Sequence, residues 1–129
     1  MMNKRLTKVT TTEKLIKYID RAIKKEGPNV DLNYIDTSLI TDMSDLFKDT
    51  KFNGDISKWN TSNVENMSCM FHDCLFNGDI SNWDTSRVKR MDWMFAGNNN
   101  PFNQDISRWN TSSVEDMQGM FCNSQFNGD

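Results

Sequence analysis

The segment at residues 52–71, FNGDISKWNTSNVENMSCMF, decides the fold, because the chain repeats it twice more. Residues 76–95 read FNGDISNWDTSRVKRMDWMF, and residues 102–121 read FNQDISRWNTSSVEDMQGMF. Phenylalanines open successive units at 52, 76, 102 and 126, at spacings of 24, 26 and 24 residues. Self-similarity at such a period is typical of proteins in which each unit packs only on its neighbours. We therefore predict a stack of units.

The large apolar residues recur at fixed places in each unit. The columns contain Phe52, Phe76 and Phe102; Ile56, Ile80 and Ile106; Trp59, Trp83 and Trp109; Val64, Val88 and Val114; Met67, Met91 and Met117; Met70, Met94 and Met120; and Phe71, Phe95 and Phe121. A diverged copy 24 residues upstream supplies Leu32, Ile35, Ile40, Met43, Leu46 and Phe47. We expect one domain over residues 1–129, with a cap at 1–30 and a repeat region at 31–129. Its units start near 28, 52, 76 and 102, and a partial unit starts at 126.

Each unit carries patterns for two short elements. Val64, Met67 and Met70 follow helical spacing, and Ser62 with Glu65 matches a capping box just before them. This predicts a helix of about two to three turns. The stretch 55–59 is too short for a helix and predicts a brief strand. The class is therefore α/β, with one strand and one short helix per unit.

The three copies closely resemble the BspA-like leucine-rich repeats, which are common in bacterial surface proteins and mycoplasma-type lipoproteins. The resemblance covers residues 28–129. It implies a short leucine-rich-repeat-like solenoid and a non-catalytic protein. Secreted members of this family are implicated in adhesion and protein binding.

An N-terminal helix is predicted to cover one end of the stack. Thr10 with Glu13 matches a capping box, and Gly27 followed by Pro28 stops the helix. Its apolar stripe contains Leu15, Ile16, Ile19, Ala22 and Ile23. Its outer face is basic, which indicates either a solvated surface or a docking site for an acidic partner.

The other end carries no such helix in this sequence, so we expect the last unit to present Ile106, Trp109 and a strand edge. Exposed strand edges are templates for pairing. One hypothesis is a two-fold homodimer through Ile106, Trp109 and Phe126. The alternative is that residues 126–129 fold back as a small lid.

The recurring polar residues predict structure rather than chemistry. Asp31, Asp55, Asp79 and Asp105 form a column that suits either turn-forming carboxylates or a cation ladder, and we favour turns. The group Cys69, His72 and Cys74 lacks the fourth ligand of a closed zinc site. We expect no catalytic residue, no metal and no cofactor.

The charge distribution and the cysteine content limit the kinds of partner and the cellular location that we expect. Residues 1–30 hold eight Lys/Arg against three Asp/Glu, and residues 31–129 hold seven against fifteen. An acidic body argues against nucleic acid. The three cysteines fit reduced thiols, and the sequence shows neither a signal-peptide pattern nor a membrane-spanning run. We expect a cytoplasmic protein that does not bind membranes.

Two surfaces are candidates for binding another protein. The units differ most at Arg87, Lys89, Arg90 and Trp93, where three cations and an extra tryptophan interrupt an acidic body. Arg and Trp are favoured at interface hot spots. The second candidate is the column Tyr34, Lys58, Asn82 and Arg108, which varies between fixed neighbours.

The sequence thus predicts a non-catalytic protein-interaction module of bacterial or phage-like origin, acting inside the cell as a binding protein, adaptor or inhibitor. The alternative is a fragment or short member of a bacterial surface adhesion protein.

Overall fold

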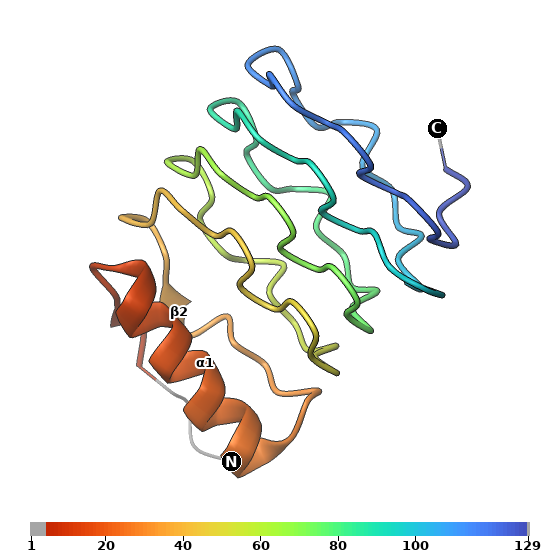
Figure 1. Ribbon diagram of the computed structural model, residues 1–129. Coiled ribbons are helices and arrows are strands. Elements are labelled where there is room, and N and C mark those ends of the chain that lie inside the picture. Colours follow the sequence, from red (N-terminus) through yellow and green to blue (C-terminus); the bar gives the residue numbers. More distant parts are fainter. Residues whose placement is uncertain (1–4, 129) are drawn as a thin grey trace.

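The computed structural model describes residues 5–128. Its named elements are β1 (Thr7–Lys8), α1 (Thr12–Glu26) and β2 (Ile35–Asp36). Beyond α1 the chain winds in successive coils that lie side by side, with α1 across one end of the stack and the C-terminus at the other (Figure 1). We call the coils unit 1 (28–51), unit 2 (52–75), unit 3 (76–101) and unit 4 (102–125).

The cap at the first end combines α1 with β1. Thr11, one residue after the predicted Thr10, is the N-cap and accepts a hydrogen bond from the backbone N–H of Lys14. Gly27, at φ 91°, ends α1. Of the predicted stripe, Leu15, Ile19 and Ala22 are buried, whereas Ile16 is 40 % exposed. Strand β1 pairs in parallel with β2 and was not predicted from the sequence.

Most of the backbone hydrogen bonds between units are donated to the following unit, whereas Glu65, Lys89 and Glu115 donate back to the preceding one. In unit 2 the N–H groups of alternate residues donate to carbonyls of unit 3, and the donors are Met67, Cys69, Phe71 and Asp73. The corresponding N–H groups of units 1 and 3 donate in the same sense to units 2 and 4. Isolated parallel bridges mark the start of this ladder in each unit, at Asp42, Asn66, Arg90 and Asp116.

The predicted short helix and strand of each unit are wrong. Among residues 28–128 the structure has no α-helix and only the two-residue strand β2. Cys69 and Asp73 have φ of 57° and 52°, which an α-helix cannot contain. The Met and Phe residues at helical spacing lie on consecutive turns, whose alternate N–H groups point to the next unit. At 55–59, the turn bond from Trp59 N–H to the carbonyl of Ile56 bends the predicted strand.

Each coil turns at corners made by Asp or Asn followed two residues later by Ser. In unit 2 the side-chain oxygens of Asp55, Asn60 and Asn66 accept the N–H groups of residues 57, 62 and 68 at 2.9–3.0 Å. These are Asx-turns, in which a short polar side chain substitutes for a backbone carbonyl. The prediction that the Asp column forms turns is thus confirmed. The hydrogen bonds to the backbone and side chain of Ser81 lower the pKa of Asp79.

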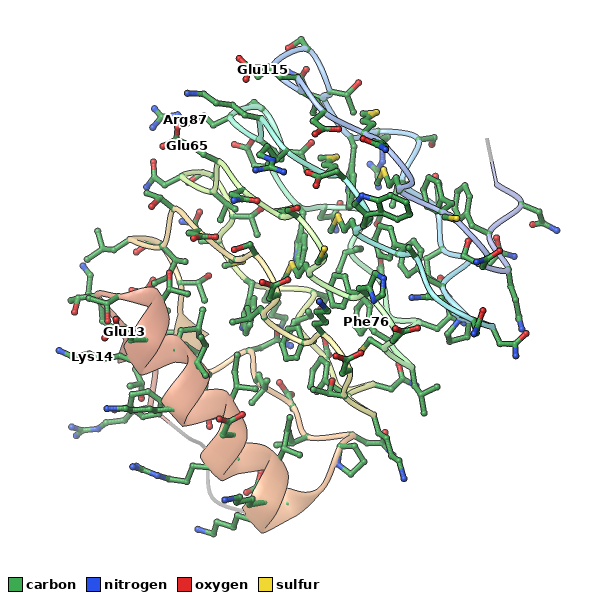
Figure 2. All side chains as sticks on the ribbon, in the orientation of Figure 1. Glu13, Lys14, Glu65, Phe76, Arg87 and Glu115 are labelled. Atoms are coloured by element: carbon green, nitrogen blue, oxygen red, sulfur yellow. The ribbon has the colours of Figure 1, made fainter. Side chains whose placement is uncertain are left out.

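The core is a set of aromatic columns that run along the stack. Phe47, Phe71, Phe95 and Phe121 lie ring over ring, with centroids 5.6, 5.4 and 5.6 Å apart. A second column passes through Phe76, which Figure 2 labels in the interior. Such pairs contribute about 0.5–1.5 kcal/mol each beyond area burial. No helix of residues 5–128 is long and apolar enough to cross a membrane.

Candidate partner-binding surfaces

The three cations of unit 3 are exposed, and each contacts a polar group of a neighbouring unit or its own. Arg87 donates to the side-chain oxygen of Asn63 at 2.9 Å, and the Lys89 ammonium lies 3.1 Å from Glu65. Figure 2 shows Glu65, Arg87 and Glu115 on one side of the stack in successive units. The basic unit therefore sits between acidic ones. These exposed pairs contribute little stability, and the cations are available to a partner.

Arg90 holds a buried carboxylate. Its guanidinium makes two bonds to Asp92, at 3.1 and 3.0 Å, and lies 4.0 Å from Asp116. The Ser68 hydroxyl of unit 2 donates to Asp92 at 2.8 Å. Burial raises the pKa of Asp92, and the hydrogen bonds from Arg90 and Ser68 lower it. The lowering is the larger effect, so the pKa of Asp92 lies below its ordinary value. Arg90 therefore has a structural task in addition to any binding role.

Trp93 lies half-buried at the end of this basic patch. Its φ of 58° is unusual for a bulky residue. The indole lies against Gly119 of the next unit, where a Cβ would meet the ring at 2.5 Å. A shallow depression of about 210 Å³ adjoins the ring, and its lining includes His72, Asp73, Trp93, Gly97, Asn98 and Cys122. The patch thus combines cations, an accessible indole and a depression.

The second predicted surface is a column of turns, not of strands. Lys58, Asn82 and Arg108 are exposed and occupy equivalent turn positions in successive units, whereas Tyr34 is partly buried. The Arg108 guanidinium approaches the side-chain oxygen of Asn82 at 3.4 Å. The column is open to solvent, and the part of the chain that the structure describes shows no aromatic residue exposed within it.

The three residues of the homodimer hypothesis lie in unit 4 and directly after it. Residues 125–128 do not fold back as a lid, because Phe126 continues its column, 6.2 Å from Phe102 and 4.2 Å from Phe121. Trp109 is only 9 % exposed, so its ring is not presented. Ile106 is partly buried and lines a depression of about 440 Å³ beside Phe126. Met117 was not predicted as a surface residue, yet it is 44 % exposed although its equivalents in units 2 and 3 are buried.

Two of the three cysteines lie in surroundings that raise the pKa of the thiol. Cys74 is buried, and its Sγ approaches the Phe52 carbonyl at 3.4 Å. Burial raises the pKa of both Cys74 and Cys69, which disfavours the reactive thiolate. Cys122 is exposed.

The single histidine lies in a different cluster from the one considered in the sequence. His72 lies beside Asp73, with Nδ1 and a carboxylate oxygen 3.0 Å apart, and potential ligand atoms of Asp49, His72 and Asp73 lie within 4.8 Å of one another. All three residues belong to the exposed margin of units 1 and 2, and both carboxylates are open to water. The cysteines take no part in the cluster, so the Cys69, His72 and Cys74 grouping does not form a ligand set.

Comparison with known proteins gives one family. No curated protein and no solved structure matches the chain significantly. A family model described as "Mycoplasma protein of unknown function, DUF285" matches residues 14–129, which include most of α1 and all four units. The chain therefore belongs to the DUF285 family of mycoplasma proteins.

Proposed function

We propose that this protein is a non-catalytic, cytoplasmic module that binds another protein, built as a solenoid of BspA-like leucine-rich repeats. The observation that carries the proposal is the patch formed by Arg87, Lys89, Arg90 and Trp93. It interrupts an otherwise regular series of units, and no repeated packing contact requires an indole at position 93, where the equivalent residues are Asp45, Cys69 and Gly119. A large aromatic residue that the core does not need, placed beside cations, is typical of an interface hot spot.

The surroundings of the reactive groups support a binding role rather than catalysis. The recurring serines donate to the aspartates of their own corners, as Ser57 does to Asp55 at 2.7 Å. The same carboxylate oxygen also accepts the backbone N–H of the serine, at 2.9 Å for Ser57, so the pair forms part of the turn. Two of the thiols have raised pKa values, as described above. A nucleophile would need the opposite surroundings.

The experiment is a pull-down from the source cell's cytosol with the intact protein and two variants. Lys89→Glu combined with Trp93→Gly alters the patch, and glycine suits both the positive φ and the equivalent position at 119. Lys58→Glu combined with Arg108→Glu reverses charge on the turn column instead. We expect a protein captured by wild type and by the turn-column variant and lost by the patch variant. Equal capture by all three would contradict the patch.

A second candidate function is surface adhesion, and the resemblance of residues 28–129 to BspA-like repeats favours it. It predicts that the protein is found on the outside of the cell. Protease treatment of intact cells distinguishes the two functions, because an external protein is digested and an internal one is protected.

A further inference from the structure

The basic side chains of the N-terminal cap surround a depression between α1 and the end of β1. Its volume is about 340 Å³. Its lining includes Lys8, Val9, Lys14, Lys17, Tyr18 and Arg21. The acidic residues of α1, which are Glu13, Asp20 and Glu26, form no part of this lining. We call the depression the basic groove, because the charged side chains around it are all cations.

The cations of the basic groove have no acidic partners within residues 5–128. All of them are exposed, and none forms an ion pair with a described carboxylate. Arg21 lies over the ring of Tyr18, 5.9 Å from its centroid, and Figure 2 shows Lys14 on the side of α1 that faces away from the units. In unit 3, by contrast, Lys89 and Arg90 pair with carboxylates. The positive charge of the groove is therefore available to an anionic ligand.

The stability of α1 does not account for these cations. The helix dipole stabilises a cation in the last turn of a helix and destabilises one in the first turn. Lys24 and Lys25 lie in the last turn and stabilise α1, whereas Lys14 lies in the first turn and opposes the dipole. Lys14, Lys17 and Arg21 also follow one another at intervals of three and four residues, at which like charges repel. The cations around the groove thus lower the stability of α1, which is more typical of a binding surface than of a solvated helix face.

The dimensions of the groove suit a short stretch of extended chain. Lys14 and Arg21 are separated by about two turns of α1, which is roughly 10 Å along the helix axis. About three residues of an extended segment cover the same length. Tyr18 is only partly buried in the lining and offers an aromatic surface between the cations. A matching ligand therefore combines carboxylates with an apolar side chain.

A long polyanion matches the molecule less well than a short acidic segment. A nucleic-acid strand extends well beyond the groove and meets the repeat region, because α1 lies directly against the first end of the stack (Figure 1). Residues 31–129 hold seven Lys/Arg against fifteen Asp/Glu, and such a surface repels phosphates. The charge distribution favours a protein ligand.

We propose that the basic groove binds a short, extended, acidic segment of another protein. Its carboxylates pair with Lys14, Lys17 and Arg21, and an apolar side chain packs against Tyr18. Because these pairs are charge-assisted and the cations have no competing partner in the described chain, they give the contact both affinity and orientation. The groove lies in the cap and the Trp93 patch lies in unit 3, so this proposal does not rest on the function proposed for that patch.

The test uses the full chain and a synthetic ligand. The probe is a fluorescein-labelled peptide of glutamates around one central leucine, and the same peptide with glutamines is the neutral control. We expect saturable binding of the acidic peptide alone in fluorescence anisotropy. Lys14→Gln combined with Lys17→Gln should weaken it about tenfold. Lys24→Gln combined with Lys25→Gln removes the same charge from the same helix outside the groove lining, and should weaken it less than about threefold.

The controls separate the groove from the net charge and from the patch in unit 3. Equal weakening by the two helix variants would mean that the peptide senses only net charge, which overturns the proposal. Arg87→Gln combined with Lys89→Gln should leave the affinity within about threefold of wild type, and a larger loss would place the site in unit 3 instead.

Two further measurements test the structural argument and the class of ligand. The variant with Lys14→Gln and Lys17→Gln should unfold at a urea concentration no lower than wild type, and a clearly lower midpoint would assign these lysines a structural role instead. A single-stranded oligonucleotide or anionic vesicles that bind more tightly than the peptide would overturn the choice of a protein ligand. Self-association of wild type in sedimentation that the same variant abolishes would make the occupant a second copy of this chain, which also overturns the proposal.

Discussion

Removing one ring from the middle of an aromatic column should cost far more than removing its equivalent at the end. Phe71 is 0 % exposed and stacks with Phe47, Phe76 and Phe95 at 5.6, 4.4 and 5.4 Å. Replacing a fully buried Phe by Ala typically costs 3–5 kcal/mol, so Phe71→Ala should lower the free energy of unfolding by about 4 kcal/mol. Phe121 is only partly buried in the structure, so Phe121→Ala should lower the free energy of unfolding by about half as much or less.

Urea unfolding monitored by tryptophan fluorescence measures both values, provided that the m-values agree. A loss of about 4 kcal/mol is a large part of the roughly 5–15 kcal/mol expected for a domain, so Phe71→Leu provides a milder second point at the same position. Equal losses at 71 and 121 would refute the reasoning. They would mean that stability is not a sum of contacts between neighbouring units.

Three further predictions follow from single contacts. Thr85→Val should lower the free energy of unfolding by about 1 kcal/mol because its hydroxyl donates to the next unit at 3.0 Å, whereas Thr111→Val should change it little; urea midpoints check both. The pKa of Asp84 is lowered by its bonds to a serine, so this stabilisation is present above the ordinary value of 3.8 and is lost as the pH falls through the lowered pKa. Asp84→Asn should keep the turn and reduce the loss of stability between pH 5 and pH 2, as acid titration of the urea midpoint would show. Native alkylation followed by mass spectrometry should modify the exposed Cys122 well before the buried Cys74.

Much of the packing was predictable because identical units must bury identical side chains. The positions named in the columns are the buried ones throughout units 1 to 3, and Leu32 and Phe47 of the diverged copy are 0 % exposed. The end of the N-terminal helix at Gly27 was also predictable, because a glycine followed by proline rarely continues a helix. Because the unit is repeated, each structural position can be compared between several copies within one chain, and the residue types that recur there indicate burial.

The backbone inside each unit was not predictable from apolar spacing, because consecutive turns and a short helix place side chains at similar intervals. One signal was present and unused. The residues Asp49, Asp73, Gly97 and Asn123 recur as a column of types that tolerate positive φ, and all four adopt it. Because this column follows the last apolar residue of each predicted helix, such as Phe71, it marks a turn at that point. Trp93 gives no such signal, because tertiary hydrogen bonds impose its conformation.

The direction of the hydrogen bonds explains how α1 can cover the first end of the stack. In the register of Met43 and Met67, each unit donates to the unit that follows it, so the carbonyls of unit 1 in this register have no preceding repeat from which to accept. A helix can cover such an end because it brings its own donor, and the Thr12 hydroxyl donates to the Asp42 carbonyl at 2.7 Å. The rest of the cover is apolar, since Leu15 and Ile19 of α1 are buried. An end of the stack that offers acceptors can therefore be closed by a helix that contributes one hydroxyl donor and an apolar face.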